Sequence, residues 1–192
     1  MQRFRPVGLD AGPFRLRPAR DADVDAALEM SRDPAIAQWY STGVVDRRSA
    51  RRWLRNGADW SGGTHATWVV ADATDRLVGN FSMVSIDLED LSAQMSYRTA
   101  PWARGRHVAT YALGAATRWA FDTLHLERLA LPHAVANPAS CRVANNVGYL
   151  LATVEPGGYR DELGRQWDTH LHTRTRSKGR DQRPFAAAPA PA

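Results

Sequence analysis

The chain has 192 residues, of which 44% are hydrophobic and 23% are charged. These fractions are typical of an ordinary soluble globular protein, and the length suits one domain with a sizeable core. No apolar run approaches the roughly 20 residues that a membrane-spanning helix needs. The N-terminus lacks the apolar segment of a secretory signal, and Cys141 is the only cysteine. We therefore expect a cytoplasmic protein without an intramolecular disulfide or a membrane partner.

The net charge of +5 is concentrated at the C-terminus. Residues 174–192 carry +4, so the other 173 residues together carry only +1. A body with so little charge does not predict a nucleic-acid-binding protein. The chain ends in alanine and proline after a basic stretch, a composition that cannot form a packed element. We therefore expect three parts, listed as an N-terminal extension over 1–12, a folded domain over 13–175 and a disordered tail over 176–192.

Strand and helix patterns alternate along the first half of the chain. Asp21 and Asp46 stand where helix N-caps are expected, and Gly57 stands where the second helix should stop. The expected elements are a strand over 14–18, a helix over 23–32, a loop over 35–44, a helix over 47–56 and a hairpin with strands 66–72 and 76–86.

The second half continues the alternation. Its expected elements are a strand over 91–100, a helix ending near 124, a strand over 127–135, a short helix over 137–147 and strands over 148–155 and 166–175. Helices that interleave with mostly antiparallel strands predict an α+β (mixed α/β) domain. The count is about seven strands in one central sheet, with about four helices beside it.

The stretch APWARGRHVATYALGAATRWAF, residues 100–121, places a basic, glycine-bearing loop directly before an amphipathic helix. Free N–H groups at a helix start bind anions, Gly105 allows close approach, and Arg104 and Arg106 add positive charge. This chemistry suits a pyrophosphate. The loop is neither a GxxxxGK[ST] phosphate loop nor a GxGxxG dinucleotide fingerprint. Taken alone, it also fits a solvated arginine-rich turn before a core helix.

Two motifs in order resemble the GNAT acetyltransferase superfamily. Residues 104–109 match its loop pattern [Q/R]-x-x-G-x-[G/A] at Arg104 and Ala109, although His107 stands where glycine is usual. A second pattern, N-x-x-S-x-x-V-x-x-x-x-G-[FY], is matched from Asn137 through Ser140 to Tyr149. The extended loop and the preceding SYRTAP resemble the branch of ribosomal-protein N-terminal acetyltransferases. The resemblance covers about residues 14–175.

The resemblance implies a single GNAT-fold domain with a twisted sheet splayed in the middle, and acetyl-CoA as cosubstrate. It implies direct transfer of the acetyl group to a primary amine in a ternary complex. The amine is a protein N-terminus or a small molecule. The residues implied to bind the cofactor are Tyr97, Arg98, Thr99, Arg104, Gly105, Arg106, His107, Val108, Ala109, Thr110, Asn137 and Ser140.

The resemblance also suggests catalytic and acceptor residues. Many GNAT enzymes carry a tyrosine four residues after the serine position, but this chain has Ala144 there, which leaves Ser140 as the expected donor of a proton to the leaving thiolate. The general base is expected in the late loop at Asp161, with other acidic side chains or a water chain as alternatives. The aromatic residues expected around the acceptor are Trp39, Tyr40 and Trp60.

Other readings stay open at this level. An antibiotic or polyamine acetyltransferase, and a GNAT-fold module that binds CoA without turnover, are the alternatives, and a homodimer is compatible with each. His170 and His172 share one face of the last strand, but no third ligand lies near them in the sequence. No metal is therefore expected. Cys141 is expected to be a packed small residue.

Overall fold

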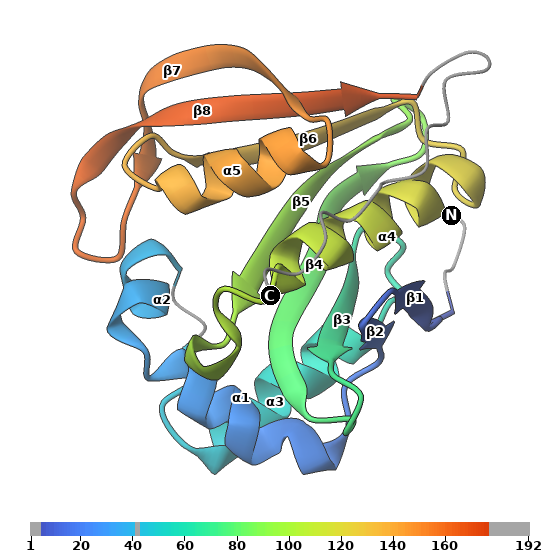
Figure 1. Ribbon diagram of the computed structural model, residues 1–192, viewed down its shortest axis with the longest axis vertical. Coiled ribbons are helices and arrows are strands. Elements are labelled where there is room, and N and C mark those ends of the chain that lie inside the picture. The colour runs from blue at the N-terminus through green and yellow to red at the C-terminus, as the bar shows by residue number, and fades with distance from the viewer. Residues whose placement is uncertain (1–4, 41–42, 177–192) are drawn as a thin grey trace, which may run out of the picture.

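The computed structural model describes residues 5–40 and 43–176. In these residues one eight-stranded sheet has the order β1-β2-β3-β4-β5-β6-β8-β7 (Figure 1). Neighbouring strands are antiparallel except for the parallel pair β5 and β6. The strands are β1 (Leu9–Ala11), β2 (Phe14–Arg17), β3 (Ala66–Ala71), β4 (Leu77–Asp87), β5 (Ser92–Thr99), β6 (Arg128–Ala134), β7 (Leu150–Arg160) and β8 (Gln166–Thr175).

Helices cover both faces of this sheet. They are α1 (Val24–Ser31), α2 (Pro34–Trp39), α3 (Arg47–Ala58), α4 (Val108–Asp122) and α5 (Pro138–Asn146), with short 3-10 turns η1 (Asp21–Asp23) and η2 (Pro101–Ala103). Successive side chains of a strand point to opposite faces. Accordingly, Trp68 and Val70 of β3 pack in the core that includes α4, whereas Val69 and Ala71 pack with α1 and α3. The α+β class predicted from the sequence is confirmed.

Local signals explain the long helices. The Asp46 carboxylate accepts a hydrogen bond from the Ser49 N–H at 2.7 Å and caps α3 as predicted. The expected apolar stripe of α4 is buried against the sheet, with Leu113 and Ala116 completely inaccessible. No helix in the described part of the chain is long and apolar enough to cross a membrane.

Two predicted boundaries need correction. The loop expected over 35–44 contains α2, because the Asp33 carboxylate accepts a hydrogen bond from the Ile36 N–H at 3.0 Å and Pro34 fits the first helical turn. The folded part also begins before residue 13, since β1 pairs with β2 through a turn at Gly12. A three-residue strand is too short to show a pattern in the sequence. The predicted tail lies outside the described residues except for Arg176.

The sheet opens between its two parallel strands. β5 and β6 pair only over Ser92–Gln94 and Arg128–Ala130, and their later halves have no ladder between them. Pro132 follows two positions later in β6, and proline has no N–H to donate to a neighbouring strand. A proline inside a strand pattern is therefore the sequence signal for this opening. The opened halves form two walls of the candidate site.

Candidate active site

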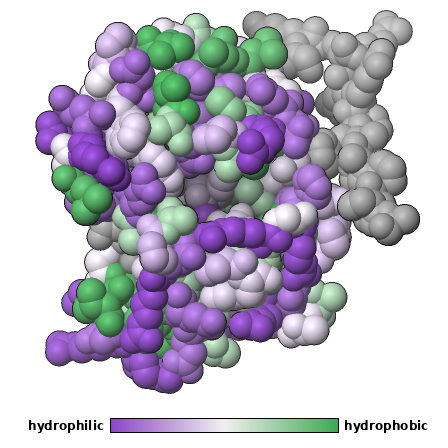
Figure 2. Space-filling view, turned by 60° about the vertical axis from the view of Figure 1, so that its left-hand side comes forward, coloured by the Kyte–Doolittle hydropathy of each residue, from purple (hydrophilic) through white to green (hydrophobic). Residues whose placement is uncertain are grey.

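A cleft of about 600 Å³ occupies the opening between β5 and β6. It lies within the volume range of small-molecule sites. Figure 2 shows this side of the molecule, hollowed near its centre and surrounded mainly by hydrophilic residues. Its walls also include the start of α4, the start of α5 and residues of α2. The cleft thus collects segments from four separate parts of the sequence.

The start of α4 presents free backbone donors to the cleft. The first helical hydrogen bond is donated by the Tyr111 N–H to the His107 carbonyl at 3.0 Å, so the N–H groups of residues 108–110 have no acceptor inside the helix. Val108, Ala109 and Thr110, which were expected to bind the cofactor, all line the cleft. Converging N–H groups at the positive end of a helix form a site for an anion.

Positive φ angles shape the loop before α4. Gly105 has φ +78° and His107 has φ +58°, both in the left-handed region that glycine adopts most easily. This conformation explains why glycine suits the position of His107. The His107 side chain is exposed, and His107 and Gly105 border the cleft. The imidazole therefore lies at the border of the cleft, exposed to solvent.

The two arginines of the loop diverge. Arg104 borders the cleft and pairs with Asp33 at the start of α2 at 2.5 Å. Arg106 was expected to contribute charge to the same anion, but its side chain faces Asp72 and the ring of Phe14 and does not border the cleft. Only the backbone of Arg106 can contribute there, because its guanidinium is directed toward Asp72 and Phe14.

At the opposite wall, Asn137, Ser140 and Tyr97 meet. Asn137 caps α5, with its Oδ1 accepting from the Ser140 N–H at 3.4 Å, so Ser140 is not the capping residue. The Tyr97 hydroxyl is buried beside Ser140 and makes no hydrogen bond in the described residues. Burial raises the pKa of Tyr97 to about 12, which the neighbouring Ser140 hydroxyl offsets only in part. Tyr97 therefore keeps its proton at neutral pH.

These features agree with the comparison to known proteins. The family model described as "Acetyltransferase (GNAT) domain" matches residues 14–150. The chain belongs to the GNAT acetyltransferase family. No curated protein sequence matches it.

Solved structures of GNAT acetyltransferases share the fold at low sequence identity. RimJ from Mycobacterium smegmatis, in complex with CoA-disulfide, has TM-score 0.79 and 20% identity, covering 90% of each chain. The ribosomal-protein-S5-alanine acetyltransferase from Vibrio fischeri has TM-score 0.76 and 16% identity, covering 88% of this chain and 96% of its own. Spermidine N-acetyltransferase from Vibrio cholerae, in complex with CoA and spermine, has TM-score 0.73 and 18% identity, covering 85% and 95%.

In this GNAT acetyltransferase, Arg98 faces away from the predicted cofactor wall. Its guanidinium is buried at 4.0 Å from the ring centroid of Tyr40 and 5.1 Å from that of Trp53, and its Nε and Nη1 have no hydrogen-bond partner in the described residues. Burial lowers the pKa of Arg98 to about 10, opposed by Tyr40. Arg98 and Tyr40 border both the cleft and a second cavity of about 290 Å³. The two cavities therefore adjoin at these residues.

The second cavity was not predicted from the sequence. It lies between α3 and strands β3 to β5, and Asn80 contributes a buried Oδ1 that has no partner in the described residues. The Asn80 side-chain amide donates to the Trp68 carbonyl at 3.0 Å, which fixes the direction of this oxygen. A buried donor on Arg98 and a buried acceptor on Asn80 thus face the same cavity. Such unpaired polar groups are costly unless a ligand satisfies them.

The aromatic residues expected at the acceptor separate into two groups. Trp39 and Tyr40 of the α2 region border the cleft, and Thr99 also lines it. Trp60 does not: its side chain is buried in the core against Trp68, and its Nε1–H donates to the Gly57 carbonyl at 3.0 Å. We therefore remove Trp60 from the acceptor site. The sequence around Trp60 contains no signal that distinguishes a tryptophan buried in the core from one at the acceptor site.

Asp161 has a structural role instead of the expected catalytic one. Its buried carboxylate closes the turn between β7 and β8, accepting from the N–H groups of Leu163 and Arg165 and from the side chains of Arg165 and Trp167 at 2.7–3.0 Å. Burial opposes its ionisation, but hydrogen bonds from Trp167 and Arg165 dominate and lower the pKa of Asp161 to about 2. A carboxylate with so low a pKa and so many donors is a poor base.

Proposed function

We propose that this GNAT enzyme is an acetyl-CoA-dependent N-acetyltransferase whose acceptor is an amine adjacent to a carbonyl or carboxylate group. A peptide N-terminus is the principal candidate, and a small amino-acid-like amine is the second. The observation that supports this choice is the buried Arg98, whose Nε and Nη1 have no hydrogen-bond partner in the described residues, beside the buried Asn80 oxygen and next to the cleft. Arg98 can donate to the carbonyl of the acceptor, and Asn80 can accept from its amine.

The residues of the cleft fit acetyl-CoA. The N–H groups of residues 108–110 would hold the pyrophosphate, and the unpaired edge of β5 over residues 97–99 would hold the pantetheine arm. Acetyl-CoA supplies an activated acetyl group. Side chains of Tyr97 and Arg98 point to opposite faces of β5, because they are consecutive in a strand. The cofactor and the acceptor can therefore approach from opposite sides, which supports direct transfer in a ternary complex.

Two hydroxyl groups can manage the proton of the leaving thiolate. Ser140 borders the cleft at the start of α5, and the protonated Tyr97 hydroxyl lies beside it. We assign Ser140 as the donor and Tyr97 as the group that orients it. The proton that Ser140 gives to the thiolate is replaced by the one that the attacking amine releases, passed through solvent. An α-amino group has a pKa of about 7.7–8.0, so much of the acceptor amine is already neutral near that pH. Solvent can accept the proton that the nitrogen releases after it attacks the thioester. This scheme needs no carboxylate base.

Spermidine and other polyamines are less suitable acceptors for this chain. A polycation would have to approach the buried positive charge of Arg98, with no carboxylate paired to that charge in the described residues. Like charges at close range in a site of low dielectric repel strongly. We further propose that the enzyme acts in the cytoplasm, where a single thiol stays reduced.

Release of CoA thiol with a panel of acceptors tests the acceptor class. We expect turnover with N-terminal peptides and amino-acid amides, and little turnover with spermidine. Arg98→Met removes the charge but keeps a long apolar stem, and should raise KM for the peptide at least about 10-fold, as expected for the loss of a hydrogen bond to a charged group. Arg52→Met on the exposed face of α3 is the matched control. Equal turnover of spermidine, or an unchanged KM in Arg98→Met, would reject the acceptor class.

Ser140→Ala tests the assignment of the proton donor. We expect kcat to fall roughly 10–1,000-fold with little change in Kd for acetyl-CoA, in the range for loss of one acid group. Tyr97→Phe should lower kcat less. Single-turnover kinetics and calorimetric titration separate the two effects. If Ser140→Ala kept full turnover, another group would have to supply the proton, and absence of turnover in the wild type with every amine would favour a CoA-binding module.

A further inference from the structure

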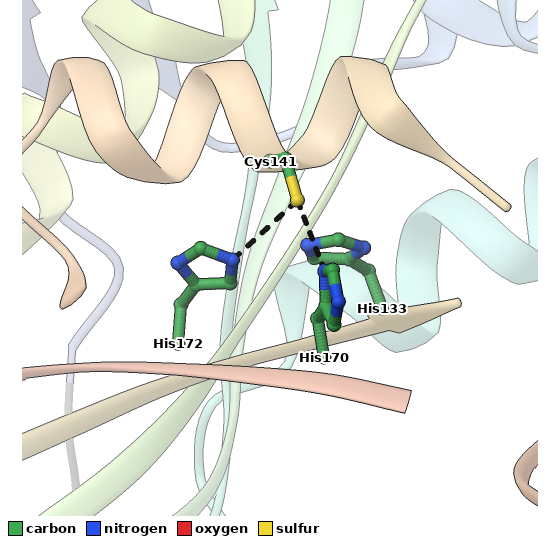
Figure 3. A group of neighbouring side chains, drawn as sticks. All are labelled: His133, Cys141, His170 and His172. Carbon is green, nitrogen blue, oxygen red and sulfur yellow. Dashed lines mark hydrogen bonds between the residues drawn. The ribbon is translucent and has the colours of Figure 1, made fainter. Parts of the chain in front are cut away.

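Four potential metal ligands from three separate elements converge next to the cleft. His133 comes from β6, Cys141 from α5, and His170 and His172 from β8 (Figure 3). One donor atom from each lies within 4.8 Å of the other three. The absence of a metal was expected because no third ligand lies near His170 and His172 in the sequence. The fold brings His133 and Cys141 next to these two histidines, so a third and a fourth potential ligand are present.

The ring hydrogen bonds fix which nitrogen atoms are available. The His133 Nδ1 lies 2.8 Å from the Ala134 carbonyl, and the His172 Nδ1 lies 3.2 Å from the Tyr149 carbonyl. A carbonyl oxygen only accepts, so each Nδ1 carries a proton and each neutral ring leaves a lone pair on Nε2. Histidine ligands in metal sites are commonly held by a carbonyl in this way. The backbone thus orients two imidazoles as ligands before any ion binds.

The His133 Nε2 atom is the strongest single indication of a ligand. His133 is 5% exposed, and this nitrogen is buried without a hydrogen-bond partner in the described residues. It faces the Cys141 Sγ, which is 3.1 Å from the His170 Nδ1 and 3.6 Å from the His172 Nε2 (Figure 3). An unsatisfied buried acceptor is unfavourable. A cation at the centre of the cluster would satisfy it.

We propose that His133, Cys141, His170 and His172 bind one Zn²⁺ ion. Zn–N bonds of about 2.0–2.1 Å and a Zn–S bond of about 2.3 Å give a tetrahedron with edges of roughly 3.3–3.6 Å. The two Sγ···N distances are already close to these edges, and small side-chain shifts close the longer ones. The cluster contains no carboxylate, which disfavours Ca²⁺ and Mg²⁺. Binding releases the Cys141 thiol proton to solvent.

The site is a structural one, because four protein ligands leave no open position for substrate. Zn²⁺ would join α5 to β6 and β8 through Cys141. The adjacent residue is Ser140, so the ion would hold the start of α5 against the cleft wall. Cys141 and His170 are partly exposed, which gives the ion a route from solvent. Metal binding does not depend on which amine accepts the acetyl group. The Zn²⁺ site can therefore be confirmed or rejected separately from the proposed function.

Metal titration of the full chain tests this site. The protein is treated with a chelator, desalted and titrated with Co²⁺, then with Zn²⁺. We expect one Co²⁺ per chain, with the strong visible absorption of tetrahedral cobalt and a thiolate-to-cobalt charge-transfer band, both removed by one equivalent of Zn²⁺. Zn²⁺ should also raise the thermal midpoint, since an ion that binds the native state stabilises it. Octahedral cobalt absorption, or no binding at stoichiometric concentration, would overturn the proposal.

Variants separate this cluster from adventitious binding. Cys141→Ala should remove the charge-transfer band, and His133→Ala should weaken Zn²⁺ binding at least about 10-fold, because even changes outside the ligand shell cost 10–100-fold. His170→Gln, at a partly exposed position, provides a variant that disturbs the core least. His125→Asn removes an exposed imidazole elsewhere and should bind Zn²⁺ like the wild type. Unchanged affinity in folded Cys141→Ala and His170→Gln, measured by circular dichroism and titration, would reject the site.

Discussion

Neighbouring residues of one strand have different tasks in this enzyme. Tyr97 turns its ring toward Phe81 and its hydroxyl toward α5, whereas Arg98 lies between Tyr40 and Trp53 on the other face. The alternation of a strand is sufficient to separate them. Because β5 has no partner beyond Gln94 on the β6 side, both faces meet the cleft. The strand thus supplies one residue to the proposed cofactor side and the next to the proposed acceptor side.

Replacement of Asp161 tests its structural role. The folded-state pKa of this carboxyl, about 2, lies below its ordinary value of 3.8. The ionised carboxylate therefore stabilises the fold above pH 4, and this contribution to the free energy of unfolding is lost as the pH falls through 2. Asp161→Asn should therefore lower the thermal midpoint at pH 7, and the gap to the wild type should narrow between pH 4 and pH 2.

Turnover distinguishes this role from catalysis. Folded Asp161→Asn should retain most of its kcat at pH 7, because the carboxylate does not border the cleft. A loss of several hundred-fold in kcat without a change in the thermal midpoint would instead restore Asp161 as the base.

At the scale of elements, the start of α4 depends on backbone conformation more than on side chains. Of the two arginines, only Arg104 faces the cleft, and it is paired with Asp33. Gly105 and His107 take left-handed conformations directly before the helix start, where the N–H groups of residues 108–110 have no acceptor inside the helix. The helix start, more than arginine charge, is therefore expected to hold the pyrophosphate.

Gly105→Val should weaken binding of acetyl-CoA at least about 10-fold while the protein stays folded. A Cβ at this position meets no atom within 4 Å, but φ +78° is unfavourable for a β-branched residue, so the loop would rearrange. Calorimetric titration measures the effect. Gly114→Ala in the middle of α4 is the control: its Cβ meets its nearest side-chain neighbour at 3.8 Å, and binding should not change. Normal affinity in Gly105→Val would show that the loop conformation is unimportant.

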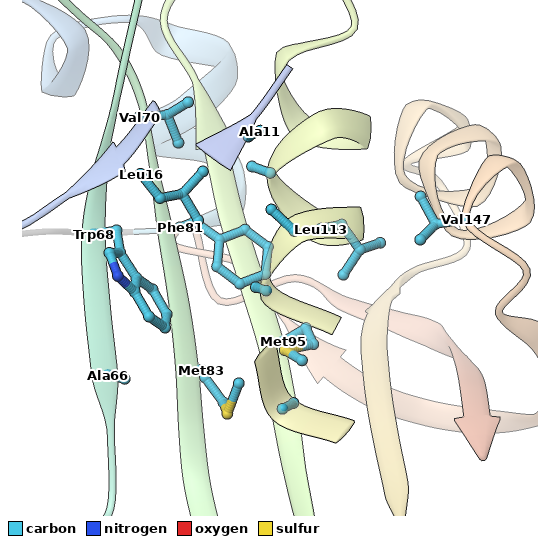
Figure 4. Packing of buried hydrophobic residues seen from close by; sticks show 14 of the residues in the cluster. Ala11, Leu16, Ala66, Trp68, Val70, Phe81, Met83, Met95, Leu113 and Val147 are labelled. Atoms are coloured by element: carbon cyan, nitrogen blue, oxygen red, sulfur yellow. The ribbon is translucent and has the colours of Figure 1, made fainter. Parts of the chain in front are cut away.

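At the scale of the whole molecule, the packing of α4 on the sheet supports the cleft. Figure 4 shows Leu113 of α4 in the same buried cluster as Phe81 of β4, Met95 of β5 and Leu16 of β2. These side chains are 0–2% exposed. They fix the distance between the helix start and β5. The buried face of α4 therefore connects the stability of the domain to the shape of its site.

Leu113→Ala should reduce the free energy of unfolding by about 2–5 kcal/mol, because it leaves a cavity in a closely packed core. Leu163→Ala, at a side chain that is 74% exposed, should change it by less than about 0.5 kcal/mol. Denaturant unfolding with a single cooperative transition measures both. Equal effects of the two substitutions would contradict the placement of α4.

The sequence by itself determined the order of most elements, the cap of α3, the inner face of α4 and the family motifs. Each of these signals arises from residues within a few positions of one another. The sequence also contains a signal for the opening of the sheet, which is Pro132 inside a strand pattern. The sequence pattern did not predict α2, because the six residues of this helix show little periodicity. The local signal for α2 is the cap formed by Asp33 together with Pro34.

Only the tertiary structure decided which polar residues meet. Trp60 resembles other aromatic loop residues in the sequence but lies in the core. The Asp161 carboxylate accepts hydrogen bonds from residues of its own turn and of the start of β8. Cys141 and His170 are 29 positions apart, yet strand pairing and the seat of α5 bring them to 3.1 Å. Arg98 is buried only once Tyr40 and Trp53 cover its guanidinium, and its Nε and Nη1 then have no hydrogen-bond partner in the described residues. Local patterns specify elements, whereas a site needs side chains from distant segments, and their convergence is set by how strands pair and helices pack.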